Sequence, residues 1–160
     1  MIKFATATKP APIRNRTILY ISYALGLGAA AMAVAQMVSF EEFIEAFRSY
    51  KFGNETLTVA IAIGILTLEV FAVPFLLRLS LSRAARFVSA WFALLLPYAW
   101  TVLTVHAFVA NATVDNAGYF GGFLRLHVGA LALAFDLLWM IVTAISFGAI
   151  GGTKVIKLKQ

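Results

Sequence analysis

"LTVAIAIGILTLEVFAVPFLL", residues 57–77, carries one charged side chain, Glu69, in a run dominated by apolar residues. An α-helix needs about 20 such residues to cross the hydrocarbon core of a bilayer. Buried strands and most buried helices of soluble domains are shorter than this run. The stretch therefore predicts a transmembrane helix.

Three further runs of this kind lie at about 17–37, 87–109 and 126–150. Hydrophobic residues make up 62% of the chain and charged residues 12%, against about 45–50% and about 25% in soluble proteins. The strands of about ten alternating residues that build a membrane β-barrel do not occur in the sequence. We therefore expect an all-α membrane protein, with residues 1–160 forming a single integral membrane domain built as a bundle of four transmembrane helices.

Basic residues predict how this bundle is oriented. Most of the 13 Lys and Arg residues precede the first run, link the second to the third, or follow the fourth: Lys3, Lys9, Arg14, Arg16, Arg78, Arg83, Arg86, Lys154, Lys157 and Lys159. The remainder lie in the other two connections: Arg48, Lys51 and Arg125. The positive-inside rule then places both termini in the cytoplasm and the sparsely charged connections outside, at the periplasmic face if the membrane is a bacterial inner membrane. The net charge of +6 is explained by topology, and no nucleic-acid partner is expected.

The connection "SFEEFIEAFRSYKFGN", residues 39–54, predicts a short interfacial helix over about 39–51. Ser39 and Glu42 have the spacing of an N-terminal capping box. Apolar side chains repeat at helical spacing at Phe40, Phe43, Ile44 and Phe47. Charged side chains that would face water are Glu41, Glu45 and Arg48. The helix is expected to act either as a lid that anchors the outer face or as a docking site for a partner.

Two acids, Glu69 and Asp136, stand midway along the second and fourth runs. A charge at the bilayer centre costs about 2.5–3.5 kcal/mol on insertion scales, so each acid should face the bundle interior and find a partner. The candidate partners are the side chains of Tyr23, Tyr98 and Thr101 and the carbonyls of Val70 and Ala93, which Pro74 and Pro97 release. If the acids are close together, one should hold a proton. The pair serves either as a hydrogen-bonded clamp or in handling a proton or ligand.

His106 precedes the stretch "VDNAGYFGGFLRLH", residues 114–127, and His127 is its last residue. Imidazoles facing each other across a helical hairpin could ligate haem or a metal. The alternative is that both bond to loop carbonyls or water, and without a supporting motif no metal site is predicted. The absence of cysteine excludes disulfides, dithiol exchange, iron–sulfur ligation and thiolate zinc sites. The outer-face candidates are His106, His127, Tyr119, Phe120 and Arg125.

The order of these features resembles the MauE/DoxX family of small four-helix membrane proteins, which are associated with periplasmic redox maturation and quinone-linked oxidation. The shared features are a basic N-terminus, the outer helix "SFEEFIEAFRSYKF", the central glutamate of "GILTLEVFAVPFLL", the basic link "RLSLSRAAR" and a glycine–aromatic turn before the last helix. The resemblance covers most of residues 17–150, and Glu69 matches the acid of the family's second helix.

The outer turn departs from this family pattern. MauE-like members carry Cys-Gly-Cys-Phe-Gly there, whereas residues 117–121 read Ala-Gly-Tyr-Phe-Gly. The resemblance thus implies a redox turn that has kept its glycine–aromatic frame but lost its thiols, so a dithiol relay is not carried over. A tight turn that needs glycine at positive φ explains Gly118, Gly121 and Gly122 equally well.

These observations lead to three functional hypotheses. The first is an accessory or interaction subunit of a redox-associated membrane or periplasmic complex, with membrane lipid and other membrane or periplasmic subunits as partners. The second is a quinone- or haem-linked membrane oxidoreductase component that uses the two acids and the two histidines. The third is a small proton-coupled transporter, which would need oligomerisation to enclose a path.

Overall fold

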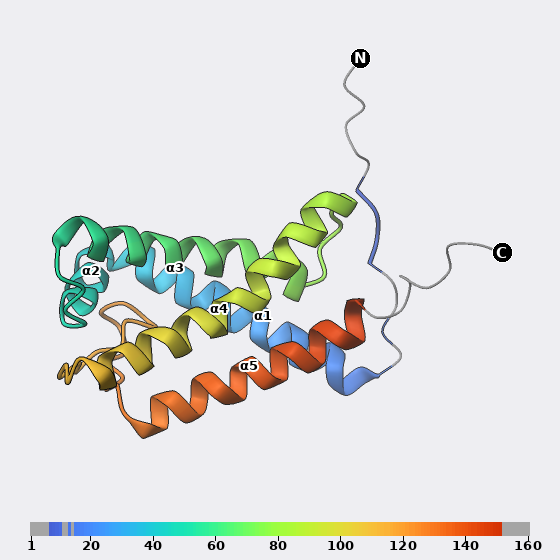
Figure 1. Cartoon of the computed structure of the whole chain (residues 1–160). Coiled ribbons are helices and arrows are strands. Elements are labelled where there is room, and N and C mark those ends of the chain that lie inside the picture. The colour runs from blue at the N-terminus through green and yellow to red at the C-terminus, as the bar shows by residue number, and fades with distance from the viewer. Residues whose placement is uncertain (1–6, 11–12, 14, 152–160) are drawn as a thin grey trace, which may run out of the picture.

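A computed structural model describes residues 7–10, 13 and 15–151 of the chain (Figure 1). Within this part every named element is a helix: α1 (Arg16–Val38), α2 (Phe40–Arg48), α3 (Glu55–Leu76), α4 (Arg83–Val109) and α5 (Ala130–Gly151). The long helices run antiparallel in a bundle, and α2 lies across one end of it. The prediction of an all-helical protein with a short helix between the first two spans is confirmed.

The bundle has two distinct ends. The loop of residues 110–129 and α2 lie at one end, which we call the loop end. The α3–α4 link, the start of α1 and the end of α5 lie at the other, which we call the terminal end. Several of the basic residues used above to predict orientation lie outside the described part of the chain: Lys3, Arg14, Lys154, Lys157 and Lys159.

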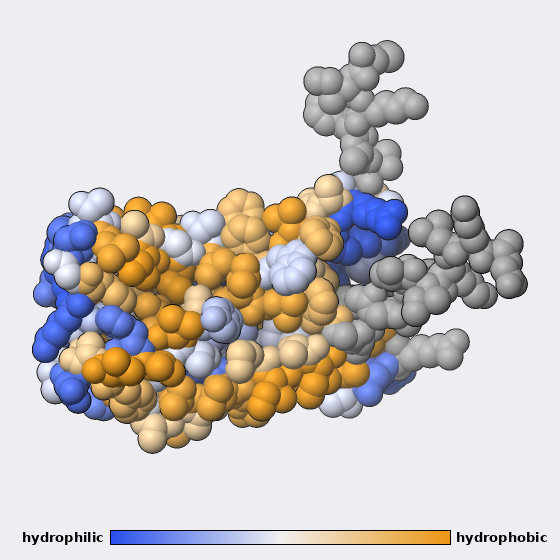
Figure 2. Space-filling model, in the orientation of Figure 1, coloured by the Kyte–Doolittle hydropathy of each residue, from blue (hydrophilic) through white to orange (hydrophobic). Residues whose placement is uncertain are grey.

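The sides of the bundle are apolar. Four described helices are long and apolar enough to cross a membrane. Within an apolar stretch of 18 residues in each of them, only 28–39% of the residues are buried inside the protein. Figure 2 shows a broad apolar band between polar ends. Side chains such as Leu131 and Ile141 point away from the core. Since such a surface is unfavourable in water, the chain is a membrane protein.

Polar caps set where the helices begin. The side chain of Asn15 accepts a hydrogen bond from Thr17 N at 2.9 Å, and that of Asn54 accepts one from Leu57 N at 2.7 Å. Ser82 caps α4 in the same way. These caps satisfy backbone N–H groups of the first turn, so α3 and α4 each begin before the apolar run does.

The last helix begins later than predicted. The apolar run starts at residue 126, but α5 begins at Ala130. Ala117 N donates to Leu126 O at 2.7 Å, and Val128 N donates to Val114 O at 2.9 Å. Leu126 and Val128 therefore use their backbone groups to close the loop rather than to start a helix.

The short helix α2 is confirmed, but its predicted capping box is wrong. Ser39 makes no side-chain cap to α2. Its hydroxyl instead donates to Ala35 O at 2.8 Å and accepts from Gly122 N at 2.8 Å, so it ties the end of α1 to the 110–129 loop. The side chains of Phe43 and Phe47 are fully buried against the bundle. The helix thus covers the loop end of the core.

Candidate functional site

The 110–129 loop folds into the loop end of the bundle. Ala117 has no exposed surface and Tyr119 is 2% exposed, although both lie in a segment without regular secondary structure. Asn116 holds the turn together, because its amide donates to Gly121 O at 2.8 Å and its oxygen accepts from Gly118 N at 3.0 Å. The loop is therefore a packed part of the core.

Two glycines allow this close approach. Gly118 has a φ of 89°, and a Cβ there would meet the ring of Phe47 at 3.2 Å. Gly121 has a φ of 56°, and a Cβ there would collide with the Ser39 hydroxyl. Both the backbone conformation and the lack of space thus require glycine.

Glu69 is fully buried near the middle of α3. Its Oε1 accepts hydrogen bonds from Gln36 Nε2 at 3.0 Å and from Trp100 Nε1 at 3.3 Å. The same Gln36 nitrogen donates to Tyr119 O at 3.0 Å and lies 3.4 Å from Gly118 O. One amide group therefore joins α1, α3 and the loop.

Asp136 is also fully buried and binds the loop from the other side. Tyr119 donates its hydroxyl to Asp136 Oδ1 at 2.6 Å, and Thr104 donates to Oδ2 at 2.7 Å. Burial, followed by the nearby Asp136 carboxyl, raises the pKa of Tyr119 well above its usual range. The phenol therefore remains a hydrogen-bond donor at neutral pH.

The two acids take different partners from those predicted. Tyr98 is 57% exposed on the outside of α4, Tyr23 is also exposed, and Thr101 donates to Pro97 O of its own helix at 2.8 Å. None of these side chains hydrogen-bonds either acid in the described part of the chain, so this prediction was wrong. The helical register explains the error, since it turns Tyr98 outward and Trp100 inward.

The carbonyls of Val70 and Ala93 were also predicted as partners, and neither hydrogen-bonds an acid within the described residues, so this prediction was wrong too. α3 continues through Pro74, and beside it Ser89 of α4 accepts from Phe75 N at 3.0 Å and donates to Phe71 O at 2.6 Å. The neighbouring helix thus satisfies the backbone at the proline, and the acids are not needed there.

Sequence reasoning missed Gln36, Trp100 and Thr104, which are all buried next to the acids. Gln36 had a usable signal, because it is the one amide side chain in the run 17–37. Trp100 and Thr104 look like ordinary residues of an apolar helix, and only the fold shows that they face the carboxyl groups.

The two histidines have separate surroundings. His106 Nε2 lies 3.1 Å from Tyr50 O, and its ring stacks on Phe52 with centroids 5.0 Å apart. His127 is exposed, with Nδ1 3.5 Å from Asp115 Oδ1. Within the described residues no group of three or more His, Cys, Asp or Glu side chains could hold a metal ion.

Arg125 lines a polar cleft on the outside of the loop end, of about 300 Å³. Acidic side chains from α2 and the loop share this cleft: Glu42, Glu45 and Asp115. Arg125 therefore lies away from the buried carboxyl groups that bind Tyr119 and Gln36.

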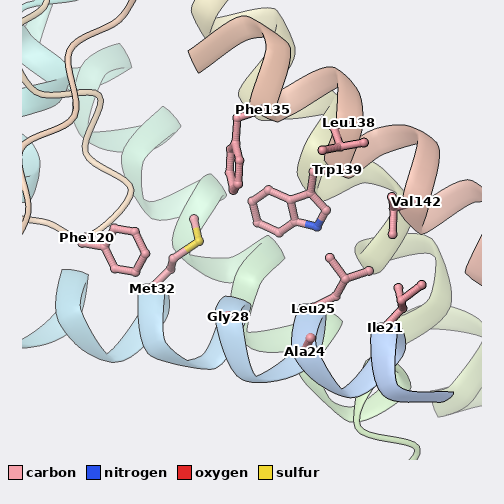
Figure 3. Close-up of a pocket in the computed structure, with 10 residues that line it drawn as sticks. All are labelled: Ile21, Ala24, Leu25, Gly28, Met32, Phe120, Phe135, Leu138, Trp139 and Val142. Carbon is pink, nitrogen blue, oxygen red and sulfur yellow. The ribbon is translucent and has the colours of Figure 1, made fainter. Parts of the chain in front are cut away.

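Phe120, the neighbour of Tyr119, lines an apolar groove between α1 and α5 (Figure 3). The groove has a volume of about 350 Å³. The lining residues are Ile21, Ala24, Leu25, Gly28, Met32, Phe120, Phe135, Leu138, Trp139 and Val142. At Gly28 a Cβ would meet none of the described atoms within 4 Å, so the missing side chain leaves the groove open. The groove lies in the membrane-spanning part and suits an apolar chain.

Comparison of the chain with protein-family models, with curated proteins and with solved structures gave no match.

Proposed function

We propose that this protein is a membrane-embedded accessory subunit of a redox-associated membrane or periplasmic complex, similar to MauE/DoxX proteins but without thiol chemistry of its own. One observation carries the proposal: Gln36, held by Glu69, binds Tyr119 O, and Asp136 binds the Tyr119 hydroxyl. The buried polar groups are thus used to hold the 110–129 loop in place. This arrangement supports a scaffold that presents a fixed surface.

The surface that would contact a partner is the outer rim of the same loop. Phe123 is 68% exposed and Leu124 is 49% exposed, and both stand next to the exposed Arg125. Exposed aromatic and aliphatic side chains beside an arginine are typical of protein interfaces. Because the inner side of the loop is clamped, the backbone that carries these side chains is already held before a partner binds, which lowers the entropic cost of association.

The proposed orientation places the loop end in the periplasm and both termini in the cytoplasm of an inner membrane. Among the described residues, five basic residues belong to the terminal end: Lys9, Arg16, Arg78, Arg83 and Arg86. Arg48, Lys51 and Arg125 belong to the loop end. This distribution supports the orientation through the positive-inside rule.

Copurification tests the proposal. Protein isolated in mild detergent should bring down the same membrane or periplasmic proteins in constant ratio, and Phe123→Ser with Leu124→Ser should remove them. Val102→Ser, on the exposed face of α4, is the matched control and should keep them. If the wild type and both variants recover the partner proteins equally, the assignment of the partner surface is wrong. If the wild type brings down no protein, the accessory role is wrong.

A second candidate, a quinone-linked oxidoreductase component, is favoured by the groove between α1 and α5. Its apolar lining and its volume of about 350 Å³ suit a prenyl tail. Extraction of the purified protein should then yield stoichiometric quinone, and Gly28→Leu, which fills open space, should abolish it. The separate surroundings of His106 and His127 give no comparable support for haem, which an absorbance scan for a Soret band would test.

A further inference from the structure

Where the 110–129 loop meets α1 and α3, two neighbouring residues each have a buried oxygen atom without a hydrogen-bond partner among the described residues; Thr143 Oγ1 of α5 is a third such oxygen, outside this contact. The two oxygen atoms at the contact are Gln36 Oε1 and Glu69 Oε2. The remaining atoms of the same two head groups already meet, since Gln36 Nε2 donates to Glu69 Oε1 at 3.0 Å. Leaving two acceptors unpaired in a buried site is unfavourable, so this pair of atoms requires an explanation.

An ionised Glu69 would leave both oxygen atoms unpaired. A carboxylate has only acceptor oxygens, and the amide oxygen of glutamine is also only an acceptor. Glu69 Oε1 is already used by two donors, Gln36 Nε2 and Trp100 Nε1. A proton on Glu69 Oε2 would make that oxygen a donor. The unpaired acceptor Gln36 Oε1 belongs to the amide that already bonds Glu69 Oε1.

We propose that Glu69 is held as the neutral acid, that it forms a two-bond acid–amide pair with Gln36, and that this pair is a proton-controlled latch on the 110–129 loop. In the pair, Gln36 Nε2–H donates to Glu69 Oε1 while Glu69 Oε2–H donates to Gln36 Oε1. A single proton thus satisfies both of the unpaired oxygens. The proposal does not depend on the proposed function.

The connection to the loop runs through Gln36. Its Nε2 donates to Tyr119 O at 3.0 Å as well as to Glu69. If Glu69 loses its proton, Glu69 Oε2 and Gln36 Oε1 are both acceptors, and no donor remains to pair them. The amide must then turn or admit water, and in either case the bond to Tyr119 O is weakened. Loss of one proton therefore loosens the loop from α1.

The neighbouring titratable groups do not replace that proton. The described titratable side chains of α1 and α2 are exposed, as are Arg83 and Tyr98 of α4, and Arg86 bonds Thr8 at the terminal end. The buried or half-buried titratable groups around the 110–129 loop are Tyr50, His106, Tyr119 and Asp136. Tyr50 donates to Ala117 O at 3.1 Å, His106 bonds Tyr50 O, and Tyr119 donates to Asp136. Each of these groups is thus occupied elsewhere, and within the described structure none of them hydrogen-bonds Glu69. An ionised Asp136 would further disfavour a second negative charge nearby.

Cysteine labelling tests the latch, because the natural chain has no cysteine. Ala117→Cys reports on loop release, since Ala117 has no exposed surface, and Thr113→Cys, exposed on the same loop, is the control. Each is made in the full chain with Glu69 and with Glu69→Gln, whose amide stays neutral and can donate to Gln36 Oε1 at every pH. Maleimide labelling rates in detergent are compared between the two backgrounds across the pH range.

At acidic pH the Ala117→Cys rates should be equal in the two backgrounds. Above the ionisation of Glu69, the ratio of the Glu69 rate to the Glu69→Gln rate should rise by up to about tenfold for each pH unit. The Thr113→Cys ratio should stay near one throughout. Equal Ala117→Cys rates at all pH values, or a faster rate for Glu69→Gln in acid, would overturn the proposal.

Infrared spectroscopy provides a second measurement that needs no reporter cysteine. The wild-type protein should show a carboxylic-acid C=O band at neutral pH that Glu69→Gln removes and Asp136→Asn retains. Gln36→Leu should shift this band, because it removes the amide partner from the acid. If Glu69→Gln instead removes a carboxylate band at neutral pH, Glu69 is ionised and the proposal is wrong.

Discussion

The indole of Trp100 lies against the ring of Tyr119 with their centroids 4.4 Å apart, and each residue donates a hydrogen bond to a different buried acid. Trp100 bonds Glu69 of α3, and Tyr119 bonds Asp136 of α5. The acids do not hydrogen-bond each other within the described structure. The two rings therefore connect the two carboxyl groups through a side chain of the loop.

Removal of the Tyr119 hydroxyl tests how strongly the loop is held. Tyr119→Phe keeps the ring contact with Trp100 but leaves Asp136 Oδ1 without its 2.6 Å donor. Loss of a partner from a buried polar group should lower the free energy of unfolding by about 1–3 kcal/mol. Thermal unfolding in detergent measures the change.

Tyr98→Phe is the matched control for this experiment. Tyr98 is 57% exposed on the same bundle, so the free energy of unfolding should change by less than about 0.5 kcal/mol. If the two variants are equally stable, the Tyr119–Asp136 bond does not stabilise the fold.

The phenylalanines of α2 provide a second matched pair. Phe47 is fully buried and contacts the rings of Phe43 and Trp100 with centroids 4.9 Å and 6.0 Å away, whereas Phe40 is 38% exposed. Phe47→Ala should cost about 3–5 kcal/mol because it leaves a cavity beneath the loop. Phe40→Ala should cost clearly less. Similar losses from both would mean that α2 does not act as the cover of the core, and chemical denaturation of each variant decides the matter.

Labelling from the two sides of the membrane tests the proposed orientation. Ser80, in the α3–α4 link, and Thr113, in the 110–129 loop, are exposed at opposite ends of the bundle. Cysteines placed there one at a time should react with a membrane-impermeant reagent from opposite sides. In intact cells Thr113→Cys should react and Ser80→Cys should react only after permeabilisation. The reverse pattern would invert the topology, and labelling from the same side would contradict the bundle.

The spans could be predicted because they depend on composition within a single segment. The composition of an apolar run such as 57–77 is enough to predict that it spans the bilayer, whatever the rest of the chain does. The helix starts also depend on local signals, as at Asn54, whose side chain caps the residue three positions later. For α5 the local apolar run was misleading, because the backbone groups of Leu126 and Val128 hydrogen-bond Ala117 and Val114 earlier in the loop.

The candidate site was only partly predictable. A buried acid signals itself by its cost in an apolar helix, which is why Glu69 and Asp136 stood out. Their partners lie 31 to 33 residues away for Glu69 and 17 to 32 for Asp136. Which aromatic side chain turns toward an acid depends on helix rotation and on the path of the loop. The sequence pattern therefore suggested Tyr98, whereas the folded chain uses Tyr119.

Substitution of Glu69 distinguishes a structural clamp from a group that handles protons or a ligand. Glu69→Leu removes the acceptor for Gln36 and Trp100 and strands two buried donors, so it should lower the free energy of unfolding by at least about 1–3 kcal/mol. Glu69→Gln keeps an oxygen for these donors and an amide for Gln36 Oε1, so its stability should remain close to that of the wild type. Thermal unfolding in detergent checks both expectations.

Two further measurements on the same variants distinguish the clamp from a proton-handling group. They are the recovery of partner proteins and any quinone-linked activity. For a clamp, Glu69→Gln retains both properties, while Glu69→Leu loses them together with stability. For a group that moves protons, Glu69→Gln remains folded and assembled but loses activity, because an amide cannot release a proton in this range. A fully stable and fully functional Glu69→Leu would contradict both roles, since neither tolerates a leucine facing the Gln36 amide.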